Sequence, residues 1–489
     1  MWRRPRATGF PATPKAATAR GGLAALVLAT VALSAEVARA QEPAPEAKML
    51  EVTSTSPEAA VLFRAGLDDA LNVIPLRTSE RMNEALALDP ELGLARVVNA
   101  FYSLGMPWDE RQAQIERGLA SLVATEASTG ELLMALAWRS WTRGEATTGR
   151  KLFGTVAELY PDDPTPAYLH AWSTQRTEGF NAAIVEFEAI TGAFPDFAPA
   201  YNTLGLRLWQ AGDRAGGIEA ISKYLDLLPD HPNANDSYAE IMQWAGRYEE
   251  AIEYYNRANE LYPIFAWSAG LAEVNQLMGE GERAREHLAV AYETAPTDGQ
   301  RIAYQLALGN SFLLDGDLEA AKDHYEAAAR EAEAGEMNGM AARAYATIAV
   351  TDALFGAGNS VESALASVEQ VVGTEHPVYR IGASLAWAAA GDAELAGEAI
   401  RELGEGSETE RHAANALLYM RQSEPERAEQ ELAMADPDND FIRALLGTCY
   451  QETGRSAEAQ ALRDDVLARR DINLANSQAA IARALAARI

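Results

Sequence analysis

The chain has 489 residues, and 41 Lys and Arg against 71 Asp and Glu give it a formal net charge of −30. This balance argues against a nucleic-acid-binding protein, because such a protein needs a cationic face to displace the counterions of phosphate groups. The one cysteine, Cys449, excludes an intramolecular disulfide and a zinc site built from several cysteines. Hydrophobic residues make up 48% of the chain, which is enough to bury a large core.

Residues 1–40 have the pattern of a secretory signal peptide. Basic residues and no acidic residue occupy positions 1–20, and an apolar run over residues 23–33 follows. This run is shorter than the about 20 residues that a membrane span needs. Ala38-Arg39-Ala40 then supplies a small-residue cleavage site before Gln41. We therefore expect an exported protein, periplasmic or extracellular, without an integral membrane span once the signal is removed. An uncleaved N-terminal anchor and an organelle transit peptide are the alternatives.

A 34-residue period runs through the rest of the chain. The residues that recur at this interval are Pro161, Pro195, Pro229 and Pro263. Glycines keep the same register, because Gly144, Gly212 and Gly246 each lie 17 residues before one of these prolines. Periods of this length are typical of stacked supersecondary units that bury a continuous core between neighbours.

One unit, residues 198–231, shows how the period arises. Apolar residues follow a helical spacing up to Ala211, and Gly212 predicts the end of this first helix, because glycine adopts the left-handed cap conformation at little cost. A second apolar stripe follows and ends at Pro229, which cannot continue a helix. Gly205 lies where the two helices must approach each other closely, so a larger side chain there would hold them apart. Each unit is thus predicted to be a helical hairpin.

These units resemble the tetratricopeptide repeat. Tyr201, Leu204, Gly205, Leu208, Gly217, Ile221, Tyr224 and Pro229 occupy the positions of that pattern in order, and residues 236–263 repeat it. More loosely, the chain is similar to exported bacterial proteins of this kind. The resemblance implies an all-α fold, an α-solenoid wound as a right-handed superhelix of about 12 helical hairpins.

The expected organisation has four parts. Residues 41–58 are rich in Pro, Glu and Ser and are predicted to form a flexible linker after the signal peptide at 1–40. The repeat array covers residues 59–470 and is clearest over 130–330. The pattern is degenerate in three segments, 93–129, 337–376 and 404–439. Residues 471–489 carry a helical apolar spacing and are predicted to form a capping helix.

The resemblance implies a partner-binding groove. In this family the first helix of each hairpin lines a concave surface, with positions five, nine, twelve and thirteen of a unit facing the groove. These positions, with the prolines as position 32, are Trp138, Trp141, Tyr168, Trp172, Asn202, Trp209, Asp236, Glu240, Gln243 and Trp244. They form an aromatic stripe with acidic residues at one end.

Two interpretations of this stripe stay open. Aromatic rings give large rigid contact areas for a peptide, and Asp236 and Glu240 could select a basic residue of the partner. The tryptophans could equally be filler packed between adjacent first helices, since aromatic residues at helical spacing are often core. The family's groove for a terminal carboxylate uses Lys, Arg and Asn, and only Asn202 is of that kind, so this mode is not expected.

The sequence therefore predicts a scaffold for protein–protein interaction that binds a partner peptide or protein, in one interpretation a basic one, along its groove. The alternatives are a carbohydrate or small-ligand binding protein that uses the tryptophans, and a subunit whose groove is filled by its own oligomer partner. No constellation of nucleophile, base and orienting group occurs, so an enzyme is not expected. The six histidines fall in different units, and neither a metal nor a cofactor is predicted.

Overall fold

The computed structural model describes residues 48–263 and 268–489. The predicted signal peptide at 1–40 and residues 41–47 of the predicted linker lie outside the described residues. Within them the chain forms α-helices and no strand, and its contacts divide it into two compact units, one up to Ser237 and one from Tyr238 onward. The fold is all-α, as predicted from the period.

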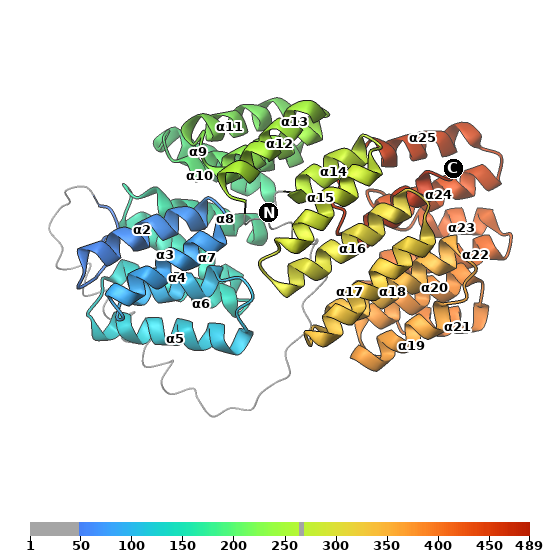
Figure 1. Cartoon of the computed structure of the whole chain (residues 1–489), viewed down its shortest axis with the longest axis horizontal. Helices are drawn as coiled ribbons and strands as arrows, with labels where there is room; N and C mark the ends of the chain where they lie inside the picture. Colours follow the sequence, from blue (N-terminus) through green and yellow to red (C-terminus); the bar gives the residue numbers. More distant parts are fainter. Residues whose placement is uncertain (1–47, 264–267) are drawn as a thin grey trace. The chain divides into compact units, whose positions relative to one another are not determined.

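The helices pair into successive antiparallel hairpins (Figure 1). In unit 1 the pairs are α2 (Pro57–Leu71) with α3 (Pro75–Leu88), α4 (Gly93–Tyr102) with α5 (Trp108–Ala124), α6 (Thr129–Thr142) with α7 (Ala146–Leu159), α8 (Pro164–Thr177) with α9 (Phe180–Ala193), and α10 (Ala198–Ala211) with α11 (Arg214–Leu227). The next helix, α12 (Pro232–Ala245), begins in unit 1 and ends in unit 2.

In unit 2 the end of α12 packs on α13 (Tyr248–Leu261), since Tyr238 of α12 donates a hydrogen bond to Glu250 of α13. The later pairs are α14 (Ser268–Leu277) with α15 (Gly281–Glu293), α16 (Asp298–Leu314) with α17 (Leu318–Ala334), α18 (Asn338–Phe355) with α19 (Val361–Val372), α20 (Pro377–Ala390) with α21 (Ala393–Arg401), α22 (Glu408–Arg421) with α23 (Pro425–Leu432), and α24 (Asp440–Glu452) with α25 (Ser456–Ala468). In Figure 1, α18 and α20 lie side by side as the first helices of neighbouring hairpins. The described residues thus form twelve hairpins, in agreement with the about 12 that the period predicts, and α26 (Ser477–Ala486) follows them.

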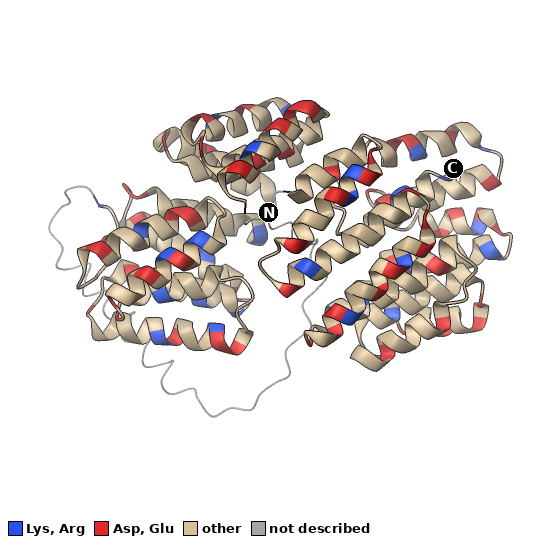
Figure 2. Ribbon diagram, viewed as in Figure 1, with Lys and Arg blue, Asp and Glu red and all other residues tan. Residues whose placement is uncertain are grey.

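Acidic residues do not gather on one element of the fold. Figure 2 shows Asp and Glu scattered over the helices of both units, with Lys and Arg between them. The excess negative charge is therefore spread over the repeats.

The hairpin at residues 198–231 has the predicted local structure. α10 ends at Gly212, which has φ 96° and ψ −7° in the left-handed region, and α11 ends at Leu227, just before Pro229. A Cβ built on Gly205 would lie 3.0 Å from both the Gly217 oxygen and the Ile221 nitrogen of α11. The predicted close approach of the two helices at Gly205 is confirmed.

We expect Gly205→Val to destabilise unit 1 by about 2–3 kcal/mol, because the branched side chain would push α10 away from α11. Gly192→Val is the matched control, since a Cβ at Gly192 of α9 meets no atom within 4 Å. Thermal unfolding followed by circular dichroism measures both. An equal melting temperature for the two variants would show that the close approach carries no energetic weight.

The segments with a degenerate pattern also form hairpins. Residues 93–129 hold α4 and α5, which approach each other through a pair of glycines: a Cβ on Gly93 would lie 2.4 Å from the Gly118 oxygen. In α18, five of the eight buried residues are alanines. Small residues allow close packing of helices, so the hairpin survives where the sequence pattern does not.

Part of the predicted flexible linker is held in place on unit 1. Residues 48–55 contain no helix, and their hydrogen bonds reach the starts of α4, α6 and α8. The Lys48 and Leu50 backbone N–H groups donate to the carboxylates of Asp162 and Asp163, at 2.9 and 3.3 Å. Further along, the Thr53 N–H donates to Glu131 at 2.7 Å. We call residues 48–55 the N-terminal strap.

The two ends of unit 1 touch each other. The Tyr224 hydroxyl of α11 donates to Asn72 Oδ1, at the end of α2, over 3.0 Å. The Asn233 side-chain amide of α12 donates to the same hydroxyl over 3.2 Å. All three side chains are buried. A polar contact thus joins the first hairpin of this unit to its fifth hairpin and to the start of α12, across the turn between α11 and α12.

His231 in that turn gives the unit a predicted pH dependence. Burial, together with Arg77 and Arg81 of α3, lowers the pKa of His231 to about 4. The unfolded chain binds this proton below pH about 6.5, while the folded chain does so only near pH 4. Stability contributed by neutral His231 is therefore complete above pH about 6.5 and is lost as the pH falls toward 4, by about 2–3 kcal/mol.

The His231→Gln variant should lack this loss. We expect wild type and variant to unfold at similar urea concentrations at pH 7.5, and the wild type to fall below the variant at pH 4.5. If the urea midpoints of the two proteins fall equally between pH 7.5 and pH 4.5, protonation of His231 is not the cause of the loss.

Candidate functional site

The predicted groove residues of unit 1 differ in their burial, and Trp138 lies in the core. Its side chain is 1% exposed and packs edge-on against Phe153 of α7, with ring centroids 5.8 Å apart. Phe101 of α4 lies against its other side at 6.5 Å. The packing interpretation therefore describes Trp138 well, because its rings fill the space between neighbouring hairpins.

Trp141 and Trp172 form an aromatic pair that is half-buried. The ring centroids lie 4.8 Å apart, and Phe101 packs edge-on against Trp172 at 6.5 Å. The Arg176 guanidinium lies 5.8 Å from the Trp141 ring. Gly149 of α7 makes room for this ring, since a Cβ there would lie 2.4 Å from Trp141 Cδ1. These two tryptophans keep some surface for a ligand, and Trp138 does not.

The remaining predicted residues of unit 1 are buried. The Tyr168 hydroxyl lies 3.0 Å from Thr203 Oγ1, and its ring contacts Phe187 and Phe197. The Arg214 guanidinium lies 4.2 Å from the Trp209 ring. Asn202 is 5% exposed and Asp236 is 3% exposed. For these side chains, contact with a partner stays a prediction.

In unit 2 the predicted groove residue Gln243 contacts a segment from the far end of the chain. Glu240 and Gln243 are buried and Trp244 is half-buried. Gln243 Nε2 donates to the Arg470 carbonyl oxygen over 3.1 Å, and the Tyr255 hydroxyl of α13 donates to Gln243 Oε1 over 2.9 Å. A first-helix side chain at a predicted groove position thus binds peptide backbone.

The bound segment is extended. Residues 469–473 carry no helix between α25 and α26, and helix α26 begins at Ser477, later than the predicted start at Asp471. Exposure alternates along the segment: Asp471 is exposed, Ile472 is 6% exposed, Asn473 is intermediate and Leu474 is 3% exposed. Such alternation is typical of an extended segment with one buried face, and Leu474 then begins the turn that leads to α26. We call residues 470–474 the cis segment.

A second amide, Asn310 of α16, holds the other end of the cis segment. Asn310 Nδ2 donates to the Leu474 carbonyl oxygen over 2.7 Å and to Ser477 Oγ over 3.2 Å. The Tyr325 hydroxyl of α17 donates to Asn310 Oδ1 over 2.7 Å. Asn310 is not among the groove residues predicted from the sequence. The repeat register could have identified it, because Gly309 fits that register and the next residue then falls at groove position nine.

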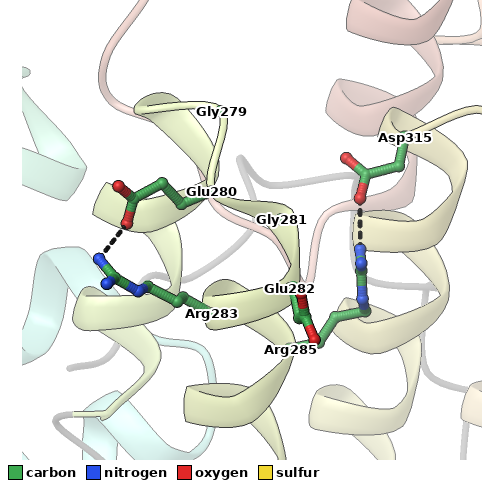
Figure 3. Close-up of a pocket in the computed structure, with 7 residues that line it drawn as sticks. All are labelled: Gly279, Glu280, Gly281, Glu282, Arg283, Arg285 and Asp315. Atoms are coloured by element: carbon green, nitrogen blue, oxygen red, sulfur yellow. Dashed lines mark hydrogen bonds and ion pairs between the residues drawn. The ribbon is translucent and has the colours of Figure 1, made fainter.

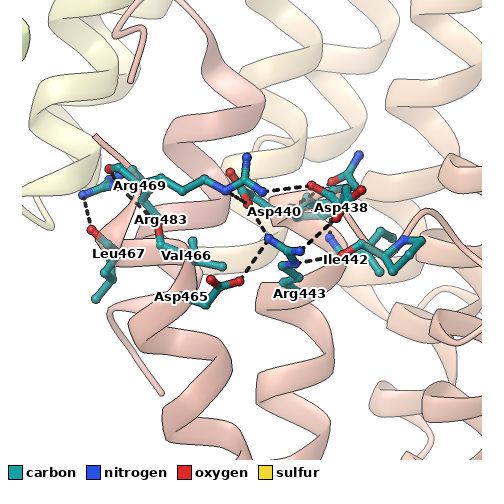
Figure 4. A network of polar contacts seen from close by, with 12 residues as sticks. Asp438, Asp440, Ile442, Arg443, Asp465, Val466, Leu467, Arg469 and Arg483 are labelled. Carbon is teal, nitrogen blue, oxygen red and sulfur yellow. Dashed lines mark hydrogen bonds and ion pairs between the residues drawn. The ribbon is translucent and has the colours of Figure 1, made fainter. Parts of the chain in front are cut away.

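Figure 4 shows the polar network that fixes the chain where it leaves α25. Arg469 Nε lies 2.9 Å from Asp440, and Arg443 is ion-paired with Asp438 and Asp465 at 3.1 and 3.0 Å. Arg483 of α26 donates to the carbonyl oxygens of residues 466, 467 and 469, at the end of α25. The cis segment thus begins directly after an anchored residue, Arg469.

The open depression in Figure 3 is a less suitable ligand site. It measures about 560 Å³ and lies at the turn between α14 and α15, beside Asp315 at the C-terminal end of α16. Its cations are paired, because Arg283 contacts Glu280 at 2.7 Å and Arg285 contacts Asp315 at 2.5 Å. This turn is the Gly- and Glu-rich sequence 279–283, which has no lysine for a phosphate.

Among the residues that the structure describes, no three His, Cys, Asp or Glu side chains are placed to hold a metal ion together. Burial raises the pKa of the Cys449 thiol to about 12, so the thiol stays protonated and weakly reactive at neutral pH. No helix in 48–263 or 268–489 combines the length and the apolar character that crossing a membrane requires.

Comparisons with known proteins agree with the repeat pattern. A family model of the tetratricopeptide repeat matches residues 245–265, which include α13. No curated protein matches the sequence. The matched residues and the hairpins define the class of the chain: an all-α protein of tetratricopeptide-like helical hairpins.

Several solved structures are similar to part of the chain. TTC0263, a thermophilic TPR protein of Thermus thermophilus, has 19% identity over 36% of this chain and 96% of its own, with a TM-score of 0.32. MamA of Desulfovibrio magneticus RS-1 has 17% identity over 34% of this chain and 94% of its own, with a TM-score of 0.30. YrrB, a TPR protein with an unusual peptide-binding site, has 16% identity over 35% of this chain and 88% of its own, with a TM-score of 0.28.

Proposed function

We propose that the chain is an exported scaffold for protein–protein interaction, which holds an extended partner segment on the first helices of its hairpins. The observation that carries this proposal is the contact of Gln243 and Asn310 with main-chain carbonyls of the cis segment. Hydrogen bonds to the main chain give affinity, and pockets for alternate side chains give specificity. The same kind of first-helix surface recurs along the repeats.

In unit 1 we propose that Trp141 and Trp172 contribute to partner binding. They are the half-buried tryptophans of the predicted stripe within this unit, and Arg176 lies beside them. Aromatic side chains and arginine are the types that most often dominate protein interfaces. The formal charge of −30 favours a basic partner through long-range attraction, which salt weakens.

Capture of binding partners from a cell-envelope extract tests this function. We expect the full chain to retain a discrete protein at moderate salt, and Trp172→Ala to reduce that retention. Trp108→Ala is the matched control, because Trp108 is 56% exposed at the start of α5, a second helix, and does not belong to the predicted stripe.

Two results would contradict the proposal. Retention of basic proteins alone, all lost at moderate salt, would indicate unspecific charge attraction. Quenching of tryptophan fluorescence by oligosaccharides, with no captured protein, would favour the carbohydrate-binding alternative. Mass spectrometry of the exported protein tests the localisation, and we expect the mature chain to begin at Gln41.

A further inference from the structure

We propose that the groove of unit 2 selects partner segments of the pattern Arg-x-apolar-x-apolar, and that the cis segment is a built-in occupant which such a partner displaces. This groove, which we call the tail groove, is formed by residues 238–245 of α12 with α14, α15 and α16. The inference rests on the proposed function, since it assigns the class of peptide that one of the interaction surfaces binds.

The two side-chain amides of the tail groove, Gln243 and Asn310, are oriented by tyrosines of the repeats and not by the cis segment. Tyr255 donates to the Gln243 side-chain oxygen, and Tyr325 donates to the Asn310 side-chain oxygen. Each amide therefore presents its N–H₂ group to the groove. The amides bind the carbonyl oxygens of Arg470 and of Leu474, which begins the turn before α26. Main-chain contacts of this kind accept any sequence.

Selectivity for apolar residues comes from what surrounds Ile472 and Leu474. Both side chains belong to one buried cluster with residues of three helices, which are Ala272 of α14, Ala284 and Leu288 of α15, and Ala307 and Leu308 of α16. The alanines leave room for branched aliphatic side chains. A polar residue at either position would be buried without a partner in this cluster, which is unfavourable.

Selectivity for arginine comes from the end of α12. Arg470 Nη1 donates to the Ala245 carbonyl oxygen, on the last residue of that helix, over 3.0 Å. A cation is stabilised at a helix C-terminus by the helix dipole. Gly246 follows with φ 78°, and a Cβ on it would lie 2.2 Å from the Arg470 guanidinium. A glycine at this turn thus makes space for the arginine side chain.

The way the cis segment is attached explains why an added peptide should bind the wild type weakly. Arg469 is fixed by the network of Figure 4, and Ser477 begins α26. The seven residues between them, 470–476, stay close to the groove at all times, so their effective concentration is high. An added peptide must compete with this occupant, and its apparent affinity falls accordingly.

A fluorescent peptide of residues 468–478 (ARRDINLANSQ) tests the proposal on the full chain. In the opened variant, Ile472→Ser with Leu474→Ser, the cis segment loses its apolar contacts. We expect this variant to bind the peptide about 30-fold more tightly than wild type does. Adding Gln243→Leu should reduce that affinity about tenfold. Peptides with Ser at the two apolar positions, or Ala at the second Arg, should bind weakly.

Circular dichroism must show that the opened variant keeps its helices. If it unfolds, hydrogen exchange on wild type replaces it: excess peptide should accelerate exchange of residues 470–474, and unchanged exchange would overturn the displacement. A folded opened variant that binds extended peptides of other patterns from an array would overturn the selectivity and leave the scaffold function standing. Binding of no peptide at all would overturn both. A wild-type dimer that exchanges its tails would assign the groove to a second copy, against the proposal.

Discussion

Replacing Glu131 by alanine should destabilise unit 1 by about 3 kcal/mol, because it removes several charge-assisted hydrogen bonds from a buried carboxylate. Glu131 is 0% exposed and accepts from the Thr53 N–H at 2.7 Å and the Thr53 hydroxyl at 2.8 Å. It also accepts from the Ser128 N–H at 3.0 Å, within the capping box that starts α6. The substitution therefore frees the N-terminal strap and weakens a helix start at once. Urea unfolding followed by circular dichroism measures the loss.

Glu110→Ala is the matched control for this variant. Glu110 also lies in the first turn of a helix, α5, but its side chain is exposed. We expect its effect to stay within about 0.5 kcal/mol. Limited proteolysis adds a local readout, since residues 48–55 should become sensitive in Glu131→Ala and stay protected in Glu110→Ala. Protection of the strap in both variants would contradict the role assigned to Glu131.

Replacing Asn310 by leucine should cost unit 2 about 3 kcal/mol and release the cis segment. Asn310 is 0% exposed. Its amide donates to the Leu474 carbonyl and to Ser477 Oγ, and it accepts a hydrogen bond from the Tyr325 hydroxyl. Leucine has a similar volume and leaves two buried groups, the Leu474 carbonyl and the Tyr325 hydroxyl, without this partner, which costs about 1–3 kcal/mol for each. Hydrogen exchange should rise over residues 470–477 before the rest of unit 2 responds.

The control for this variant is Asn338→Leu at the start of α18, where the asparagine is exposed. We expect a change within about 0.5 kcal/mol there. If Asn310→Leu unfolds unit 2 completely, Tyr325→Phe offers a milder test, because it removes the one hydroxyl that orients the Asn310 amide. Unchanged exchange at residues 470–477 in both Asn310→Leu and Tyr325→Phe would contradict the proposed attachment of the cis segment.

The two variants each release a non-helical segment from the hairpins, residues 48–55 in unit 1 and residues 470–474 in unit 2. A helical repeat buries its apolar faces against its neighbours, and each segment covers part of the surface that the stacked hairpins leave open. In unit 1 the N-terminal strap donates to carboxylates at the starts of three first helices: Asp89 before α4, Glu131 in the first turn of α6, and Asp162 before α8. In unit 2 the cis segment covers the first helices by accepting from their amides. Side chains alternate in both segments, since Leu50 and Val52 of the strap pack against the core of unit 1 while Met49 and Glu51 are exposed.

The sequence by itself determined the repeating unit. The 34-residue spacing of Pro195, Pro229 and Pro263 predicted hairpins, and the structure confirms their ends and the close approach at Gly205. These features are local, because one hairpin closes within a unit and depends on glycine, proline and apolar spacing inside that unit. The degenerate segments were harder to assign, since small residues replace the recognisable ones there.

Only the tertiary structure decided what the first helices contact. Trp138 is core while Trp172 keeps exposed surface, although both occupy position nine of their units. Gln243 binds a carbonyl that lies 227 residues further along the chain, and Asn310 binds one that lies 164 residues further. A short extended segment has little periodic signal. Leu474 also fits the helical spacing of the apolar residues in α26, so the sequence predicted one helix from Asp471 onward. Contacts over such separations depend on how many hairpins stack and turn between them, which no single unit of the sequence encodes.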